Sequence, residues 1–302
     1  MTSPDTNTST DRSHAATADL DVSDATPDLV DLVVSYLGDR SSRDLDAIMT
    51  HFDRERTVYI DAVLGRQNYS FDQLRAAFAG VLPGFPPGSH SYATKVLGDA
   101  TSAILFFTDE AALFGHEVNV VAALNFTSGL ITRQIDYWDG RHFTVVDADK
   151  NRLPDDQFPT DFKESTVGET AAPETQRVAN ALGQAFAAGD GAAAATLFAS
   201  DATFEDLTLH AEVFGEIAIR AYLDRALVLL PYGVGSAVRH VLGNGRAGGY
   251  EWSAAAGGAV RRGITALTID ERGLISRLSA IWDGSLVRRA AIVQMQALTI
   301  EK

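Results

Sequence analysis

The sequence contains no cysteine and no run of about 18 apolar residues, the length that a membrane-spanning helix needs. Without cysteine, a disulfide framework and a thiolate metal site are both excluded. The N-terminus also lacks the basic-then-apolar order of a signal peptide, so we expect a soluble, cytoplasmic protein. The histidines show neither an H-E-x-x-H motif nor another clustered ligand spacing, and we therefore expect no metal site.

Basic residues are scarce, because 25 Lys and Arg stand against 40 Asp and Glu and leave a formal charge of -15. This charge repels nucleic-acid phosphates and anionic lipids, so we expect neither nucleic acid nor a membrane as a partner. With 302 residues, of which 46% are hydrophobic, the chain is long enough for two cores of about 100–150 residues each.

The chain repeats itself. Val96–Asp99 returns as Val241–Asn244, and the segment 129–140, with its Gly-Leu-Ile opening and Trp-Asp-Gly ending, returns as 273–284. The units of solenoids and propellers recur every ~20–50 residues, so a repeat as long as this one is a whole domain. The sequence therefore predicts two similar domains in tandem.

The regions outside the repeats are polar. Residues 1–26 are rich in Thr, Ser, Asp and Ala and have too few apolar residues to offset the entropy of ordering. The segment 146–172 is polar and rich in acidic residues, with prolines along it and at its end, which is typical of a linker. The predicted organisation is a disordered tail over 1–26, a first domain over 27–145, a linker over 146–172, a second domain over 173–291 and a C-terminal tail over 292–302.

Each repeat opens with helical periodicity and closes with alternating strand patterns. The expected helices are 28–37, 44–52 and 71–82 in the first repeat, and 175–188, 191–198 and 216–230 in the second. Ser70 with Gln73 forms a capping box, and the G-x-G-x-x-G match at 243–248 lies between strand patterns, as a hairpin turn does. The predicted fold class is α+β: two tandem cone-shaped domains, each a curved antiparallel sheet covered by about three N-terminal helices.

The segment 189–206 resembles the start of the ketosteroid isomerases and their relatives in the nuclear-transport-factor-2-like superfamily. That superfamily includes the SnoaL-like polyketide cyclases and the tandem epoxide hydrolases of polyether biosynthesis. The closing segments 129–138 and 273–282 resemble the last strand of those epoxide-opening enzymes. The resemblance covers both repeats and implies the cone fold, whereas the reaction stays open because the superfamily includes isomerases, cyclases, hydrolases and binding proteins.

Asp206 is the first candidate for catalysis. In the strand 203–206, Phe204 and Asp206 point to one face, so Asp206 faces the interior if Phe204 does. A carboxylate in an apolar pocket has a raised pKa, which suits a general base. By resemblance, this is the position of the proton-shuttling Asp of the ketosteroid isomerases. The alternative is an Asp that caps a turn at the end of its strand.

The matching strand of the first repeat is 58–61. A one-residue gap leaves two registers, with either Asp61 or Ile60 opposite Asp206, and a one-residue slip reverses the face. We expect Asp61 to point inward together with Tyr59.

Two further residues add polar groups to the first cone. The resemblance places Tyr36 where the ketosteroid isomerases carry the Tyr that stabilises an oxyanion, and Leu182 stands there in the second repeat. Tyr36 is otherwise a core aromatic. In the last strand, Asp136 stands where the second repeat has Ala280, on the face that we expect to line the cone. It adds a second carboxylate, which favours one protonated and one ionised group. An outward-facing Asp136 would be an ordinary exposed acid.

His90 and Asn119 are weaker candidates. His90 lies near the place where the polyether epoxide hydrolases keep a second acid, which neither repeat has, and its imidazole suits proton donation. A lone histidine is more often structural. On the penultimate strand, Asn119 or Thr265 stands near a second oxyanion position of the family.

The sequence as a whole predicts a cofactor-independent cyclase or isomerase that acts by general acid-base catalysis. The expected substrate is a hydrophobic small molecule, such as a polyketide or terpenoid intermediate. We expect the first repeat to be the active one. Epoxide opening and non-catalytic binding are the alternatives. The domains pair within one chain or in a homodimer. The predicted catalytic residues are Asp61, Asp136, Tyr36, His90 and Asp206. The predicted substrate-binding residues are Tyr59, Trp138, Asn119, Phe204 and Trp282.

Overall fold

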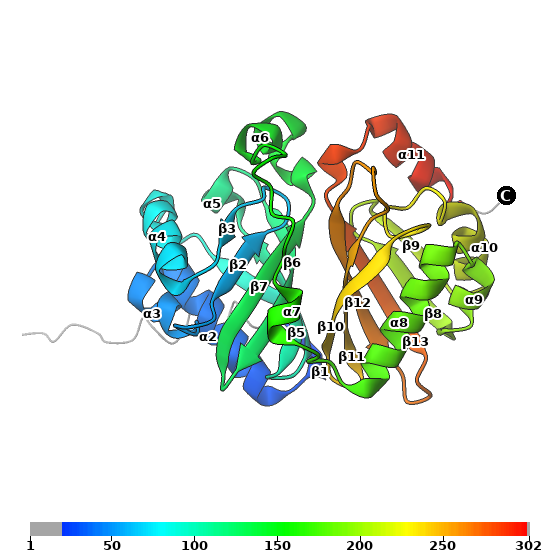
Figure 1. Cartoon of the computed structure of the whole chain (residues 1–302), viewed down its shortest axis with the longest axis horizontal. Helices are drawn as coiled ribbons and strands as arrows, with labels where there is room; N and C mark the ends of the chain where they lie inside the picture. Colours follow the sequence, from blue (N-terminus) through cyan, green and yellow to red (C-terminus); the bar gives the residue numbers. More distant parts are fainter. Residues whose placement is uncertain (1–19, 301–302) are drawn as a thin grey trace, which may run out of the picture.

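The computed structural model describes residues 20–300, which form two units of similar construction joined by a helical linker (Figure 1). The elements of the first unit are β1 (Asp21–Ala25), α2 (Pro27–Ser42), α3 (Leu45–Thr50), β2 (Val58–Asp61), β3 (Gln67–Asn68), α4 (Phe71–Val81), η1 (Leu82–Gly84), β4 (Ser91–Gly98), β5 (Ser102–Asp109), α5 (Ala111–Phe114), β6 (Val118–Thr127), β7 (Leu130–Trp138) and η2 (Gly140–Phe143).

The second unit follows the linker helices α6 (Val145–Asn151) and α7 (Glu164–Val167) and has a similar order, without counterparts of β1, η1 and α5 and with a further helix added at its end. Its elements are α8 (Pro173–Ala188), α9 (Gly191–Ala195), β8 (Phe198–Asp206), β9 (Ala211–Phe214), α10 (Glu216–Ala226), β10 (Ala237–Gly243), β11 (Ala247–Ser253), β12 (Arg262–Ile269), β13 (Ile275–Trp282), η3 (Gly284–Leu286) and α11 (Arg289–Ala297).

Both sheets are antiparallel meanders extended by a parallel pair after the last strand, and the first sheet has a second parallel pair between β1 and β4. The strand orders are β1-β4-β5-β6-β7-β2-β3 and β10-β11-β12-β13-β8-β9. Strands β4 to β7 and β10 to β13 are antiparallel neighbours, whereas β2 runs parallel to β7 and β8 runs parallel to β13. The α+β class with two tandem domains is therefore confirmed, and each sheet is mixed rather than purely antiparallel.

The ends of the chain differ from the prediction. Most of the predicted tail, residues 1–19, lies outside the described residues, but Asp21–Ala25 forms β1, which pairs with β4 and places Asp21 3.1 Å from Lys95 Nζ. The predicted C-terminal tail contains most of α11. Ile292 and Met295 of this helix are buried in the second core. Short-range composition does not reveal such long-range partners.

The start of α4 follows the predicted capping box with one change. Ser70 Oγ accepts a hydrogen bond from the backbone N–H of Gln73 at 3.3 Å. The Gln73 side chain accepts in return from the N–H of Tyr69 at 2.7 Å, one residue earlier than in the standard motif. The cap fixes where the chain enters the helix that covers the first sheet.

The helices of each unit lie on the outer side of its sheet, and the two sheets face each other at the centre (Figure 1). We call the interior between the first sheet and helices α2, α3 and α4 the first cone, and that between the second sheet and α8, α9 and α10 the second cone. The first cone is lined by apolar residues that include Leu29, Val33, Ile48, Phe52, Phe78, Leu105 and Phe107. The second is lined by residues that include Val178, Phe198, Phe204, Leu209, Ile219 and Leu267.

The layer between the two sheets, which we call the seam, has an apolar cluster of its own that includes Ile60, Ile104, Val121, Ile135, Leu242, Ile264 and Ile281. Gly249 lies where the backbones are close, because a Cβ there would overlap the Thr265 carbonyl oxygen of β12 and stand 2.7 Å from Ile104 Cδ1 of the first sheet. The two Trp-Asp-Gly endings also meet at the seam, where the Gly140 N–H donates to Asp283 Oδ1 at 3.2 Å. The Asp and Gly of the repeated ending therefore join the domains.

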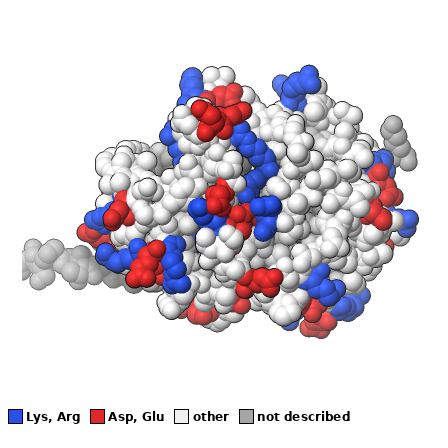
Figure 2. Space-filling view, in the orientation of Figure 1, with Lys and Arg blue, Asp and Glu red and all other residues white. Residues whose placement is uncertain are grey.

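A buried ion pair crosses the seam. Arg133 of β7 holds Glu251 of β11 through two hydrogen bonds of 2.7 and 3.0 Å, and Tyr137 Oη donates to the same carboxylate at 2.7 Å. Both charged side chains are 0% exposed. At the surface, charged side chains of both signs gather around α7 (Figure 2). Just before this helix, Lys163 forms an ion pair with Asp161.

Candidate functional site

Two carboxyl groups lie side by side in the first cone. In the parallel pairing of β2 with β7, Asp61 stands opposite Asp136 and Tyr59 opposite Gln134. Val58 and Ile60 belong to the seam cluster, so their neighbours in β2 point to the other face. The register with Asp61 inward is the one that the structure has, and Ile60 faces the second sheet.

Asp61 closes β2 and accepts hydrogen bonds from its own turn. Its Oδ1 accepts from the N–H groups of Val63 and Leu64, each at 2.8 Å, and from Trp138 Nε1 at 3.2 Å. Desolvation outweighs these bonds and raises the pKa of Asp61 to about 7, with a further contribution from the charge of Asp136. This carboxyl is therefore poised to gain or lose a proton near neutral pH.

Asp136 is 6% exposed and is held by two neighbours. Tyr59 Oη donates to its Oδ2 at 2.5 Å, and Gln134 Nε2 donates to its Oδ1 at 2.9 Å. Burial raises the pKa of Asp136 above its ordinary value, although both hydrogen bonds and the charge of Arg40 act against this. The predicted inward orientation of Asp136 and Tyr59 is confirmed.

Tyr36 lies in the same interior, 0% exposed, with its ring edge against Phe52 and His51. Burial raises the pKa of its phenol, so the hydroxyl keeps its proton. The Gln134 side chain lies close enough to lower the pKa of the Tyr36 phenol. The phenol and the Gln134 amide nevertheless do not form a hydrogen bond. Tyr36 is thus both a core aromatic and a buried hydroxyl.

Arg40 was not predicted. It lies one turn after Tyr36 on α2, is 7% exposed, and donates from Nη2 to Asp109 Oδ2 at 2.8 Å. Ser91 Oγ donates to the other oxygen of Asp109, and the guanidinium stacks over the ring of Phe107 at 5.3 Å. The sequence feature that could have identified Arg40 is its spacing from Tyr36, which places both side chains on one face of a helix.

Aromatic side chains pack in a row next to these carboxyls. The ring of Trp138 lies 4.9 Å from Phe143, Phe143 lies 5.9 Å from Phe114, and Phe114 lies 5.3 Å from Phe85. Phe114 is 38% exposed, so the row leads from the indole that binds Asp61 to the surface.

The second cone holds one carboxyl. Asp206 is 0% exposed, and its Oδ2 accepts from Tyr232 Oη at 2.8 Å and from Trp282 Nε1 at 3.1 Å. Its Oδ1 accepts from the N–H of Leu209 at 2.8 Å, so Asp206 also caps a turn. Burial raises the pKa of Asp206 to about 6 despite these bonds. Phe204 and Trp282 lie in the same interior, as predicted.

Asp61 and Asp206 occupy equivalent places. Asp61 pairs with Asp136 two residues before Trp138, and Asp206 pairs with Ala280 two residues before Trp282. In each cone the tryptophan indole donates to the aspartate. The two repeats therefore share an Asp–Trp pair.

Two candidates lie outside the cones. The side chain of His90 is 45% exposed and sits 3.4 Å from Glu110, with its Nδ1 toward the carboxylate. Asn119 is exposed and accepts from Thr108 Oγ1 at 2.8 Å, because the alternation of β6 turns it away from the interior. The expectation that these two side chains line the site was wrong, whereas Thr265 is buried in the second cone.

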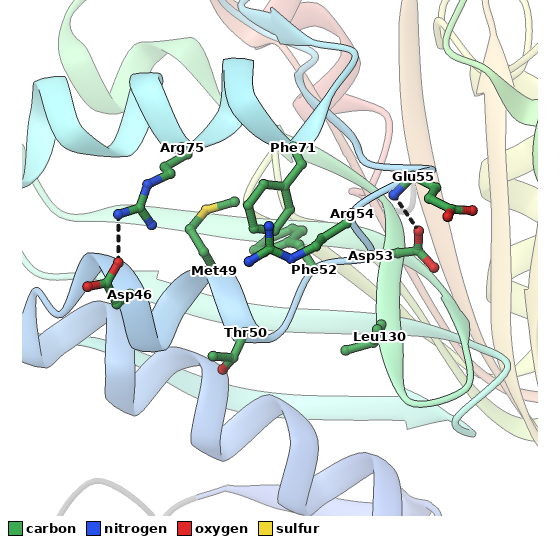
Figure 3. Close-up of a pocket in the computed structure, with 10 residues that line it drawn as sticks. All are labelled: Asp46, Met49, Thr50, Phe52, Asp53, Arg54, Glu55, Phe71, Arg75 and Leu130. Carbon is green, nitrogen blue, oxygen red and sulfur yellow. Dashed lines mark hydrogen bonds and ion pairs between the residues drawn. The ribbon is translucent and has the colours of Figure 1, made fainter.

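Figure 3 shows a pocket of about 590 Å³ between α3, the following loop and α4. It is lined by Asp46, Met49, Thr50, Phe52, Asp53, Arg54, Glu55, Phe71, Arg75 and Leu130. Met49, Phe52 and Phe71 also belong to the apolar cluster of the first cone, whereas neither Asp61 nor Asp136 lines this pocket. Asp136 is buried at 6% exposure, whereas Asp61 is partly exposed.

Within residues 20–300, no three His, Asp or Glu side chains are arranged to hold a metal ion. Over the same range, no helix combines the length and the apolar character needed to cross a bilayer.

No protein-family model and no curated protein matches this chain. Similar solved structures include a steroid delta-isomerase from Pseudomonas aeruginosa, at 18% identity and a TM-score of 0.34, covering 44% of this chain and 93% of that one. An NTF-2 like protein of unknown function from Burkholderia xenovorans has 22% identity and a TM-score of 0.30, covering 36% and 83%. A SnoaL-like protein of unknown function from Burkholderia thailandensis has 15% identity and a TM-score of 0.32, covering 37% and 96%. These similarities concern the fold alone. The chain is similar to proteins with the nuclear-transport-factor-2-like fold.

Proposed function

We propose that the first cone is the active site of a cofactor-independent cyclase or isomerase that acts by general acid-base catalysis on a hydrophobic small molecule. The observation that carries this proposal is the pair of neighbouring carboxyls Asp61 and Asp136, both with raised pKa values, inside an apolar interior. Two carboxyls this close resist ionising together, so one carries the proton while the other acts as the base.

The residues around this pair fit the proposed chemistry. In an isomerisation, the ionised carboxylate removes a proton from a carbon next to a carbonyl group, and the protonated carboxyl returns a proton at another carbon. The Tyr36 phenol, kept neutral by burial, adds a hydrogen-bond donor to the same interior. Walls such as Phe52, Phe78 and Phe107 suit an apolar carbon skeleton, for which polyketide or terpenoid intermediates are the substrate class.

Proton exchange in an apolar ketone tests this proposal without knowledge of the natural substrate. The α-protons of 2-tetralone exchange with solvent deuterium when a base removes them, and NMR follows the loss of their signal. We expect the protein to accelerate this exchange and the Asp61→Asn/Asp136→Asn variant to lose the acceleration. A wild-type rate equal to that of buffer would argue against proton abstraction in the cone.

Epoxide opening is the second candidate, and the same carboxyl pair favours it. A protonated Asp61 donates to the epoxide oxygen while an ionised Asp136 activates a hydroxyl or water. Opening of styrene oxide in labelled water, followed by mass spectrometry, separates hydrolysis from isomerisation because only hydrolysis incorporates solvent oxygen.

A non-catalytic binding role predicts a different outcome. Native mass spectrometry of protein purified from its own host would then show the same bound molecule in the wild type and in the Asp61→Asn, Asp136→Asn and Asp206→Asn variants. A ligand whose mass changes or that accumulates in one variant marks an enzyme and identifies the working cone.

A further inference from the structure

Buried polar atoms without a protein partner gather in the two cones. Among residues 20–300, seven of the ten such atoms belong to cone-lining residues, three in the first cone and four in the second. Folded proteins pair the large majority of their buried polar groups, since an unpaired one costs about 1–3 kcal/mol. Their concentration in the cones indicates that their partners are supplied by bound molecules.

The three atoms of the first cone are Arg40 Nη1, Tyr36 Oη and Gln134 Oε1. Their residues are 7%, 0% and 0% exposed, respectively. Tyr36 and Arg40 lie one turn apart on α2, and Gln134 donates to Asp136 from β7. The Gln134 side chain lies close to the Tyr36 phenol, so the three residues belong to one region of the cone, which also contains Asp136.

The neighbours of these residues fix the hydrogen-bonding role of each atom. Arg40 uses Nη2 for Asp109, so Nη1 is left as a donor. Gln134 uses Nε2 for Asp136, so Oε1 is left as an acceptor. Tyr36 keeps its proton because burial raises its pKa, and it adds a second donor. The set offers two donors and one acceptor.

A hydroxyl group has the matching pattern, since its oxygen accepts two hydrogen bonds and its hydrogen is donated once. A ketone or ether oxygen only accepts and leaves Gln134 unpaired, and an ammonium group only donates and leaves Arg40 unpaired. We propose that Arg40, Tyr36 and Gln134 form a binding site for a hydroxyl group, carried by the substrate or by a water molecule, beside the carboxyl of Asp136. The inference rests on the proposed function only in taking the first cone as the place where the substrate binds.

The second repeat lacks this site. Helices α2 and α8 have the same length and both begin with proline, so Tyr36 corresponds to Leu182 and Arg40 to Phe186. The strand register places Leu278 at the position of Gln134, because Leu278 pairs with Phe204 as Gln134 pairs with Tyr59. All three polar residues are replaced by apolar ones, which makes the proposed site specific to the first cone.

Three naphthalenes of nearly the same shape test the proposal by fluorescence titration: 2-naphthol donates and accepts, 2-methoxynaphthalene only accepts, and naphthalene does neither. We expect the wild type to bind 2-naphthol about tenfold more tightly than 2-methoxynaphthalene, the effect of one hydrogen bond to a buried group. The variants Tyr36→Phe, Gln134→Leu and Arg40→Lys, the last of which keeps a cation beside Asp109, should each lose most of this preference.

The matched control is Tyr222→Phe, which removes an unpartnered buried phenol from the second cone and should leave the preference unchanged. Asp136→Asn separates this proposal from the proposed function, because it should abolish proton exchange and keep the naphthol preference. A preference that survives all three first-cone variants, or that Tyr222→Phe removes, overturns the proposal.

A high-resolution crystal structure of the protein without ligand decides the remaining case. If the wild type shows no naphthol preference, an ordered oxygen within hydrogen-bond distance of Arg40 Nη1, Tyr36 Oη and Gln134 Oε1 assigns the site to water. Neither a preference nor an ordered oxygen there means that the proposal is wrong.

Discussion

The two cones share a backbone and differ in what fills them. Strand register and helix position match five polar residues of the first cone to apolar residues of the second. The matched pairs are Tyr36 and Leu182, Arg40 and Phe186, Tyr59 and Phe204, Gln134 and Leu278, and Asp136 and Ala280. Only the aspartate and its tryptophan, Asp61 with Trp138 and Asp206 with Trp282, occur in both.

The second cone has polar groups of another kind. Tyr250 stands where the first cone has Leu105, and Trp252 stands where it has Phe107, as the pairings along β11 and β5 show. These residues carry neutral donors and no second carboxylate. The difference teaches that the fold supplies one inward-facing aspartate to each repeat, and that among residues 20–300 only the first cone pairs this aspartate with a second carboxyl.

The largest expected effect is on proton exchange. Asp136→Asn should reduce the exchange rate of 2-tetralone by about 10²–10⁴-fold, the contribution of a positioned acid or base. Asp206→Asn should change it less than twofold, because the second cone lacks the partner carboxyl. The rates are measured by NMR at saturating ketone. The reverse pattern, with Asp206 essential, would assign catalysis to the second cone and break the comparison.

The seam offers a comparison of the same residue in both repeats. Arg133 and Arg277 occupy matching Gly-Leu-Ile-x-Arg positions, yet Arg133 is fully buried with Glu251 whereas Arg277 is 40% exposed beside Glu205. Arg133→Met should lower the free energy of unfolding by about 3–5 kcal/mol, since it leaves a buried charge unpaired. Arg277→Met should cost less than about 1 kcal/mol, as exposed ion pairs do.

Urea unfolding of both variants measures this difference. The Arg133→Met/Glu251→Leu variant should recover most of the lost stability, because replacing both partners of a buried ion pair removes the unpaired charge. If the double variant is as unstable as the single one, the loss comes from packing at the seam and not from charge.

The raised pKa values predict how stability depends on pH. A carboxyl whose pKa rises on folding binds its proton more tightly in the folded state, so its contribution is most favourable below the unfolded pKa of about 3.9 and is lost as pH rises through the folded value. For Asp206 that loss falls between about pH 4 and the folded pKa of about 6. For Asp61 it extends to about 7.

Replacing Asp206 removes its contribution to the pH dependence of the free energy of unfolding. Between pH 4 and pH 7, the stability of Asp206→Asn should rise relative to the wild type by roughly 2 kcal/mol. The exposed Asp201→Asn variant is the control and should run parallel to the wild type. The comparison is made at each pH because Glu251 and His240, with pKa values lowered to about 2 and about 4, add slopes of opposite sign that both proteins share.

The sequence predicts the fold well because its signals are local and repeated. Helix periodicity, the cap at Ser70 and the strand alternation place most elements within a few residues of their observed bounds. The inward direction of Asp61, Asp136 and Tyr59 follows from alternation once the register is chosen. The register itself needed the pairing of β2 with β7, which is far away in sequence.

What the sequence misses depends on long-range contacts. Arg40 looks like an ordinary helix residue until Asp109, distant in the chain, meets it in the interior. Arg133 and Arg277 have the same local pattern, and only the packing of the second sheet buries one of them. The prediction that His90 lines the site was wrong because of another long-range contact. The resemblance located the loop of His90 but did not show that Glu110 holds its side chain at the surface.

The smallest expected effect concerns that histidine. His90→Gln should leave the exchange rate of 2-tetralone within about twofold of the wild type, since a half-exposed side chain paired with Glu110 touches neither carboxyl of the first cone. Glu110→Gln is the matched variant and should behave alike. A large loss in the His90 variant alone, with Asp136→Asn still active, would mean that the protein closes on its ligand and brings His90 inward, and the acid of the first cone would then come from a loop instead of the sheet.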